Sequence, residues 1–209
     1  QRQMCIRDRL YELQKDEIKA EEEKKEKGML PKTKVNLTDF QEDAIPRIKS
    51  RLNKYGAILI ADSVGLGKTY ISAKLLEEIG YYQRENILVI CPAQLREMWR
   101  KFLKNIDVKE NVLSQEELAS NDFIQKAKAA VGGDLSTVKL VVVDESHNFR
   151  NPLSNRWENL FTLVNEHMAV KEKPYMVFLT ATPINNTIWD LYWQIMLLLS
   201  LIHISEPTR

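Results

Sequence analysis

The sequence is poor in cysteine and histidine, and its charges nearly cancel. It has two cysteines and three histidines, and their spacing is not that of a metal site. So few cysteines argue against a disulfide framework and fit a reducing compartment. The formal net charge is +1, which excludes a global polycation, so any nucleic-acid binding must come from a local surface.

Long apolar runs are absent as well. The longest one, residues 195–204, is interrupted by Ser200 and His203, whereas a membrane span needs roughly 18 apolar residues. Charges occur inside every candidate apolar segment of residues 1–9, unlike in a signal peptide. We therefore expect no membrane partner and a cytoplasmic location, nucleoid-associated if the source is prokaryotic.

The composition is that of a globular domain. The 209 residues are 44% hydrophobic and 28% charged, which suits one α/β domain with appendages. Residues 32–199 carry this domain, and the Lys- and Glu-rich residues 10–31 are expected to form a solvated helix or a disordered lead-in. Residues 1–9 and 200–209 resemble translated sequencing-adapter read-through, so we expect both to be artefacts on a natural chain that was cut at both sides.

Strand-length apolar runs alternate with amphipathic helical patterns along the domain. The apolar runs are 57–61, 86–91, 139–143 and 175–179, with a weaker one within 108–114. The helical patterns are 39–53, 70–79, 94–104, 116–131, 157–164 and 189–199. Fully apolar strands between helices predict a three-layer α/β fold, with a mainly parallel sheet covered by helices on both faces. Gly80 is expected to end the second helix, and Pro46 to kink the first or move its start.

The first apolar run enters a glycine-containing loop, and a helical pattern follows it. The loop consists of Asp62, Ser63, Val64, Gly65, Leu66, Gly67, Lys68 and Thr69. A strand, a loop and a helix in this order form a phosphate cradle, because the loop N–H groups point inward and the helix N-terminus adds positive charge. Lys68 would reach the terminal phosphates, and Thr69 would place its hydroxyl on Mg²⁺. Asp62 departs from the strict pattern, which has Gly there, and a tight turn that happens to contain Gly-Lys-Thr is the alternative.

Two adjacent carboxylates, Asp144 and Glu145, follow the third clear strand. Ligands of open parallel sheets bind at the carboxyl ends of the strands. Asp144 would hold a nucleotide-bound metal, usually through water, and Glu145 would orient and deprotonate an attacking water. The alternative is a strand that simply ends in acidic turn residues. His147 can join the site or serve as a packed loop residue.

A second polar turn, Thr180-Ala181-Thr182, follows the fourth clear strand. Small hydroxyl residues at this position can form hydrogen bonds with the acidic turn of a neighbouring strand. A β-to-α turn capped by threonine explains the same residues without any function. The residues alone leave these two readings open.

In chain order, four segments resemble successive motifs of superfamily-two helicases, and most closely those of the Snf/Swi-type double-stranded DNA translocases. The segments are residues 62–69, residues 87–92 with Trp99, residues 144–147 with Asn151, and residues 179–183 with Asn185 and Asn186. Asp is common in that group at the position of Asp62. The resemblance covers about residues 35–199.

The resemblance implies the first of two RecA-like lobes, an N-terminal P-loop NTPase lobe with ATP and Mg²⁺ as cofactors. Lys68, Asp144 and Glu145 would be its catalytic residues. Gln41 would read adenine, although its capping-box spacing from Thr38 also gives it a complete structural role. The residues expected to couple nucleotide state to DNA contact are His147, Thr180, Ala181 and Thr182.

The expected function is therefore that of the ATP-binding motor lobe of an ATP-dependent double-stranded DNA translocase. In the family, the second lobe of the same parent chain supplies arginine fingers and half of the DNA track. Because this chain ends after the first lobe, we expect it to bind ATP weakly and hydrolyse it poorly. The alternatives are the motor subunit of a restriction system, an RNA helicase, or a scaffold that binds nucleotide without hydrolysis.

Overall fold

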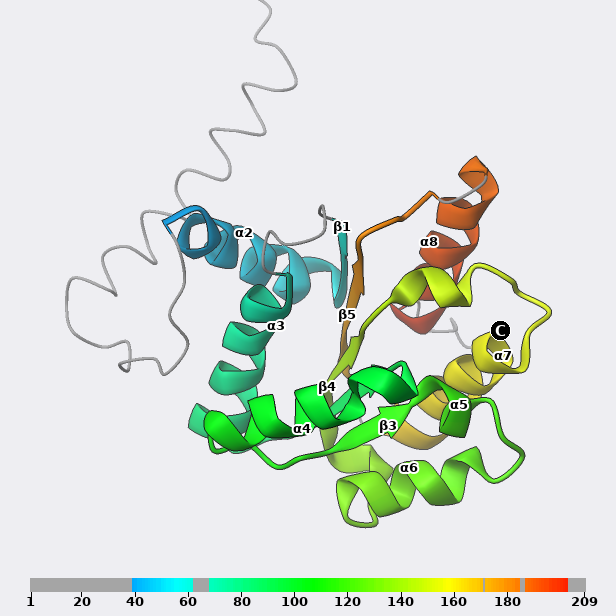
Figure 1. The fold of residues 1–209 in the computed structure, drawn as a ribbon, viewed down its shortest axis with the longest axis horizontal. Helices are drawn as coiled ribbons and strands as arrows, with labels where there is room; N and C mark the ends of the chain where they lie inside the picture. Colours follow the sequence, from blue (N-terminus) through cyan, green and yellow to red (C-terminus); the bar gives the residue numbers. More distant parts are fainter. Residues whose placement is uncertain (1–38, 62–67, 171, 185–186, 203–209) are drawn as a thin grey trace, which may run out of the picture.

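The computed structural model describes residues 39–61, 68–170, 172–184 and 187–202. Five strands form one parallel sheet in the order β1-β5-β4-β2-β3 (Figure 1). The strands are β1 Ala57–Ala61, β2 Asn86–Cys91, β3 Val112–Ser114, β4 Val138–Val143 and β5 Tyr175–Thr180. The predicted parallel α/β sheet is confirmed, and the weak apolar run supplies a short edge strand.

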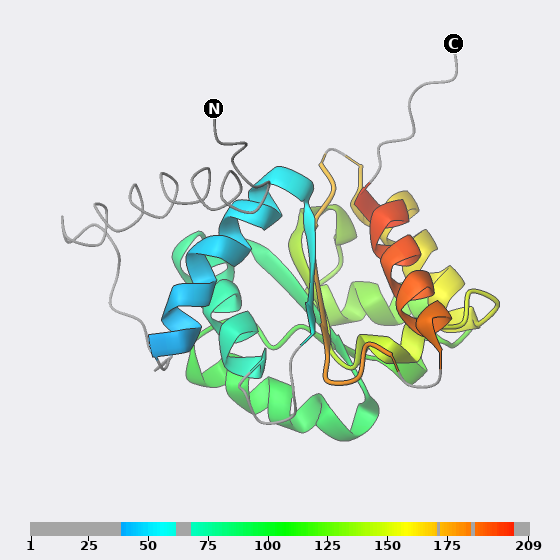
Figure 2. The same ribbon diagram turned by 90° about the horizontal axis from the view of Figure 1, so that it is seen from above.

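Helices cover both faces of the sheet (Figure 2). On one face lie α2 Asp39–Tyr55, α3 Lys68–Leu76 and α4 Arg96–Asn105. On the other lie α5 Gln115–Leu118, α6 Phe123–Val131, α7 Asn155–Thr162 and α8 Ile188–Ile202. None of the helices in the described ranges is long and apolar enough to cross a membrane.

The central strands are apolar throughout because both of their faces are buried. Val142 of β4 lies between Val89 and Val177 of the neighbouring strands, and all three pack against α2, α3 and α4. The next residue along β4, Val143, belongs to the separate core on the opposite face. Successive side chains of a strand point to opposite faces, so an uninterrupted apolar run is what this position requires.

For the N-terminal helices, the structure excludes one of the two alternatives for Pro46 and corrects the expected helix end at Gly80. The first helix runs from Asp39 to Tyr55 through Pro46, so the proline does not move its start. The second does not end at Gly80, because α3 continues as the π-helical segment η1, Glu77–Tyr82. A Cβ on Gly80 would lie 2.7 Å from Val108 Cγ1. The glycine therefore permits a close approach between segments and does not end the helix.

The single helix expected over residues 116–131 is instead two, α5 and α6. Ser114 begins α5 with a complete capping box that it shares with Glu117. The side-chain amide of Asn159 donates to Leu118 O at 2.8 Å and to Ser120 O at 3.4 Å. A helix break is tolerated here because a neighbouring helix supplies donors for the carbonyls that the break leaves.

The last two helices are longer than their sequence patterns. After α7 the chain continues in the π-helical segment η5, Leu163–Met168, whose Leu163 and Met168 are fully buried. Helix α8 continues past residue 199 to Ile202, and Leu201 is fully buried in the core. The core contacts of these residues favour helix beyond the predicted ends.

Candidate functional site

Three of the segments singled out in the sequence meet at one edge of the sheet. Ala61, the last residue of β1, pairs with Thr180, the last residue of β5. β4 lies on the other side of β5 and is followed by Asp144 and Glu145. The end of β5 thus lies between the acidic turn, residues 144–149, and the strand that leads into the glycine-containing loop.

The phosphate-loop prediction is only partly covered by the structure. β1 ends at Ala61 and α3 begins at Lys68, in the strand-to-helix order that the prediction requires. Residues 62–67 lie outside the described residues, and so do the side chains of Gln41, Lys68 and Thr69. Their binding roles stay predictions.

Asp144 is held on several sides. Its Oδ2 accepts a hydrogen bond of 2.9 Å from Trp99 Nε1, and its Oδ1 accepts one of 2.9 Å from the Glu145 N–H. Its own N–H donates to Ile90 O at 2.8 Å, which extends the β2–β4 ladder by one step. Trp99 is fully buried in α4, so the carboxylate is oriented by a rigid donor.

Glu145 has a left-handed backbone, with φ 50° and ψ 49°. This conformation is uncommon for a residue with a side chain and is found at functional sites and in turns. It begins the 3₁₀ segment η4, Ser146–Phe149. The hydrogen bond from the Glu145 N–H to Asp144 Oδ1 supports the conformation and ties the two carboxylate residues together.

His147 connects the acidic turn to the end of β5. Its Nδ1 lies 3.1 Å from Glu145 Oε2 and 3.3 Å from Thr180 Oγ1. The same Thr180 oxygen accepts a hydrogen bond of 3.2 Å from the Thr182 N–H. The structure thus brings Glu145, His147 and Thr180 together, whereas Thr182 is exposed and Ala181 half-buried.

Two buried glutamines, Gln115 and Gln194, were missed by the sequence interpretation. The amide of Gln115 donates to Asp144 O at 2.7 Å and accepts from Asn148 Nδ2 at 2.9 Å. Gln194 accepts a hydrogen bond of 3.1 Å from Ser146 Oγ. A weak signal was available for Gln194, because it is polar within the apolar α8 pattern, and a buried polar side chain requires a partner.

The end of β2 is strongly shielded from water. Burial first, and the nearby Asp144 carboxylate second, raise the pKa of the Cys91 thiol to about 12. Cys91 is fully buried. Its thiolate form is therefore disfavoured at neutral pH, as is usual for a buried structural cysteine.

The donors at this edge fit a magnesium ion held by few protein ligands. Mg²⁺ usually keeps several waters and takes one or two carboxylates together with substrate phosphates. Within the described part of the chain, no group of three or more His, Cys, Asp or Glu residues could hold a metal. A single carboxylate such as Asp144 suits Mg²⁺ better than it suits zinc, which needs a cage of N and S ligands.

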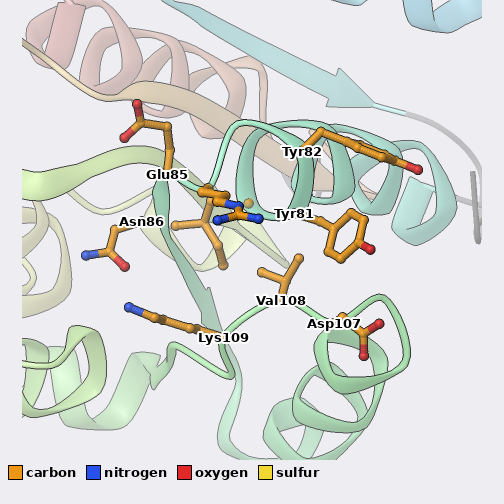
Figure 3. Close-up of a pocket in the computed structure, with 10 residues that line it drawn as sticks. Tyr81, Tyr82, Glu85, Asn86, Asp107, Val108 and Lys109 are labelled. Atoms are coloured by element: carbon orange, nitrogen blue, oxygen red, sulfur yellow. The ribbon is translucent and has the colours of Figure 1, made fainter. Parts of the chain in front are cut away.

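A separate hollow of about 680 Å³ lies at the opposite edge of the sheet (Figure 3). Its walls come from η1, the start of β2 and the segment that follows α4, and they include Tyr81, Arg84, Asn86 and Lys109. Because the strands are parallel, this hollow is at the amino end of β2 and cannot be part of the site around Asp144.

The five-stranded parallel sheet, covered by helices on both faces and with two polar turns at one edge, has the fold of a RecA-like lobe. Within that class, the chain belongs to the family described as type III restriction enzyme, res subunit, whose model matches residues 34–185. The match covers most of residues 32–199, the domain that the sequence predicts.

Curated relatives include helicases and chromatin regulators. The chain is 27% identical over 169 residues to the uncharacterized ATP-dependent helicase YqhH of Bacillus subtilis, and the match covers 73% of this chain and 27% of that protein. It is 29% identical over 175 residues to the SWI/SNF-related matrix-associated actin-dependent regulator of chromatin subfamily A-like protein 1 of Xenopus tropicalis, covering 77% of this chain and 17% of that protein. The chain thus spans about a quarter or less of the length of these relatives. The similarity to them confirms the predicted Snf-type first lobe.

A solved structure shares the fold. The Sulfolobus solfataricus SWI2/SNF2 ATPase core in complex with dsDNA matches with a TM-score of 0.60 and 21% identity, over 81% of this chain and 37% of that chain.

Proposed function

We propose that the chain is the ATP-binding motor lobe of an ATP-dependent double-stranded DNA translocase that acts in the cytoplasm. The observation that carries the proposal is the meeting of Asp144, Glu145 and Thr180 beside the end of β1. The relatives support it, since their names include an ATP-dependent helicase and a SWI/SNF-related regulator. The solved neighbour is an ATPase core in complex with double-stranded DNA.

In this proposal, the residues of the glycine-containing loop and the start of α3 bind ATP. Lys68 and the loop N–H groups contact the phosphates, and Gln41 reads the adenine. Thr69 and Asp144 would hold Mg²⁺, which neutralises charge on the phosphates when bound. Trp99 keeps the Asp144 carboxylate in one orientation through its 2.9 Å hydrogen bond.

Glu145 orients the attacking water and accepts its proton. His147 Nδ1 lies within hydrogen-bond distance of both Glu145 Oε2 and Thr180 Oγ1. A displacement of the β5 turn, residues 180–184, therefore reaches the Glu145 carboxylate through one imidazole ring. This is a physical route by which DNA contact and nucleotide state could influence each other.

The lobe alone is expected to hydrolyse ATP poorly. A second lobe would supply a cationic group, and such groups are worth roughly 10³–10⁵ in rate in related phosphoryl transfers. Turnover of the 209-residue chain should therefore stay near the buffer background with double-stranded DNA present. DNA-stimulated turnover at ordinary enzyme rates would contradict this part of the proposal.

The proposal is tested by titrating the chain with a fluorescent ATP analogue in the presence and absence of Mg²⁺. Lys68→Ala should weaken binding by about tenfold or more, which corresponds to roughly 1.4 kcal/mol. Lys101→Ala, an exposed site on α4, is the matched control and should bind like the unchanged chain. No Mg²⁺-dependent binding, or equal binding by both variants, would reject the proposal.

A longer parent chain tests the chemistry. Glu145→Gln should keep ATP binding and lose turnover, because the amide cannot accept the proton of the attacking water. Glu158→Gln, at an exposed position of α7, controls for the loss of one charge. Normal turnover in Glu145→Gln would remove Glu145 from the role of base.

A second candidate is the motor subunit of a restriction system, which the description of the family model favours. The sequence downstream of residue 199 in the parent would distinguish a motor from a scaffold, since a second lobe with an Arg-containing helicase motif supports a motor. Comparing turnover with double-stranded DNA and with RNA would separate a DNA motor from an RNA helicase.

A further inference from the structure

Gln194 of α8 connects two turns that lie far apart in the sequence. Its Oε1 accepts a hydrogen bond of 3.1 Å from Ser146 Oγ in the acidic turn. Its Nε2 donates to Pro183 O at 3.0 Å, directly after the Thr180–Thr182 segment, and to Asp190 O at 2.9 Å within α8. One amide therefore contacts the acidic turn, the β5 turn and its own helix.

The surroundings make these bonds sensitive to position. Gln194 and Ser146 are both fully buried, so no bulk water is at hand to replace a lost partner. A buried polar group that loses its partner incurs its full desolvation penalty, which strongly favours the bonded geometry. A shift of α8 relative to the sheet would strain the Ser146 bond, the Pro183 bond, or both.

The opposite flank of the acidic turn is held differently. Gln115 contacts Asp144 O and Asn148 Nδ2, and both partners lie within the acidic turn. Gln115 can fix the shape of that turn but does not connect it to β5. Gln194 makes the described side-chain connection between α8 and both turns.

We propose that Gln194 is a positioning residue that keeps the acidic turn and the β5 turn at a fixed spacing, so that His147 stays between Glu145 and Thr180. It does not touch the reacting atoms and acts through Ser146 and Pro183. The inference rests on the proposed function, because it takes Glu145 as the acting group. Beyond that function, the proposal states that the position of α8 sets the spacing between the acidic turn and the β5 turn.

The first test measures backbone amide hydrogen exchange in the 209-residue chain by mass spectrometry. Gln194→Leu removes the amide and leaves an apolar side chain one bond shorter, and it should speed exchange at least fivefold in residues 144–149 and 180–184. Exchange in β2 and β4 should be unchanged. Gln125→Leu, at an exposed position of α6, is the control and should exchange like the unchanged chain in both turns.

Ser146→Ala separates the two connections and serves if Gln194→Leu does not fold. It removes the donor to Gln194 Oε1 and leaves the bonds to Pro183 O and Asp190 O available. Exchange should then rise in the acidic turn and stay unchanged in residues 180–184. The proposal would be overturned if exchange in the acidic turn of Ser146→Ala were unchanged. It would also be overturned if Gln194→Leu raised exchange equally in all strands, because that result indicates a general loss of stability.

Turnover of a longer parent chain provides a separate readout. Gln194→Leu should lower kcat at least fivefold with KM for ATP within twofold, because binding groups are untouched while Glu145 is misplaced. An equal kcat would overturn the proposal. If the unchanged parent does not hydrolyse ATP, the proposed function fails, and the exchange experiment still decides whether Gln194 holds the two turns together.

Discussion

The reactivity of Cys91 reports how well water is excluded from the interior next to Asp144 and Glu145. Burial and the nearby Asp144 raise its pKa to about 12, so the native thiol should resist alkylation by iodoacetamide at pH 8. With Cys5 replaced by Ser, Cys91 is the one remaining thiol of the chain. We expect labelling only at the rate of unfolding, measured by mass spectrometry with and without urea. Rapid labelling in native buffer would contradict the shielded site.

The same thiol should contribute to the pH dependence of stability. An ordinary Cys thiol ionises near pH 9.0, whereas the folded thiol has a pKa of about 12. Between these values the unfolded chain loses a proton that the folded chain keeps, so the free energy of unfolding falls as pH rises above about 9. Cys91→Ala should show a shallower fall in urea titrations from pH 8 to 10. Parallel curves for the two proteins would exclude this contribution.

The individual site residues differ in how far the sequence could reveal them. Asp144, Glu145 and Thr180 could be grouped because each follows an apolar run, and the carboxyl ends of parallel strands share an edge. Gln115 could not be grouped with them, because its bonds to Asp144 O and Asn148 depend on how α5 packs against β3 and α7. The left-handed backbone of Glu145 was equally hidden, since no local sequence rule requires it.

Helices show the same division between local pattern and tertiary packing. The apolar spacing located every helix that covers the sheet, because that face must be buried. The same spacing wrongly predicted a helix end at Gly80 and one continuous helix in place of α5 and α6. A glycine used for close packing has the same sequence appearance as one that ends a helix, and the Asn159 donors that permit the break come from a distant segment.

Gly80→Ala tests the close approach between η1 and the segment after α4. The added Cβ would lie 2.7 Å from Val108 Cγ1, and relieving such an overlap typically costs 1–3 kcal/mol, so a loss of about that size is expected. Urea unfolding followed by circular dichroism measures it. Val108→Ala should recover part of the loss in the double variant, because it removes the clashing methyl groups. Strictly additive losses would show that the strain lies elsewhere.

The sheet as a whole depends on its last strand. β1 pairs with β5, the final strand in the sequence, and β5 also joins β1 to β4. A chain that ends at residue 170 lacks β5 and α8, and it should lose its cooperative urea transition because β1 has no neighbour. A chain that ends at residue 202 keeps every described element and should unfold like the full chain. A cooperative transition in the 170-residue chain would refute this dependence.

The overall architecture was predictable, but the order of the strands was not. Apolar runs separated by helices indicate a parallel sheet. They do not reveal that β5 is inserted between β1 and β4, because that choice depends on how α8 and α2 pack on opposite faces.

β5 comes last of the strands in the sequence but lies inside the sheet, and this has a consequence for folding during synthesis on the ribosome. A ribosome releases β1 early, yet the partner strand of β1 emerges only after more than half of the domain has been made. Until then the apolar residues of β1 and an open strand edge are exposed to other nascent chains, which is the situation in which aggregation begins. Slow synthesis would prolong that exposure, so this lobe should depend on chaperones that bind short apolar segments during translation.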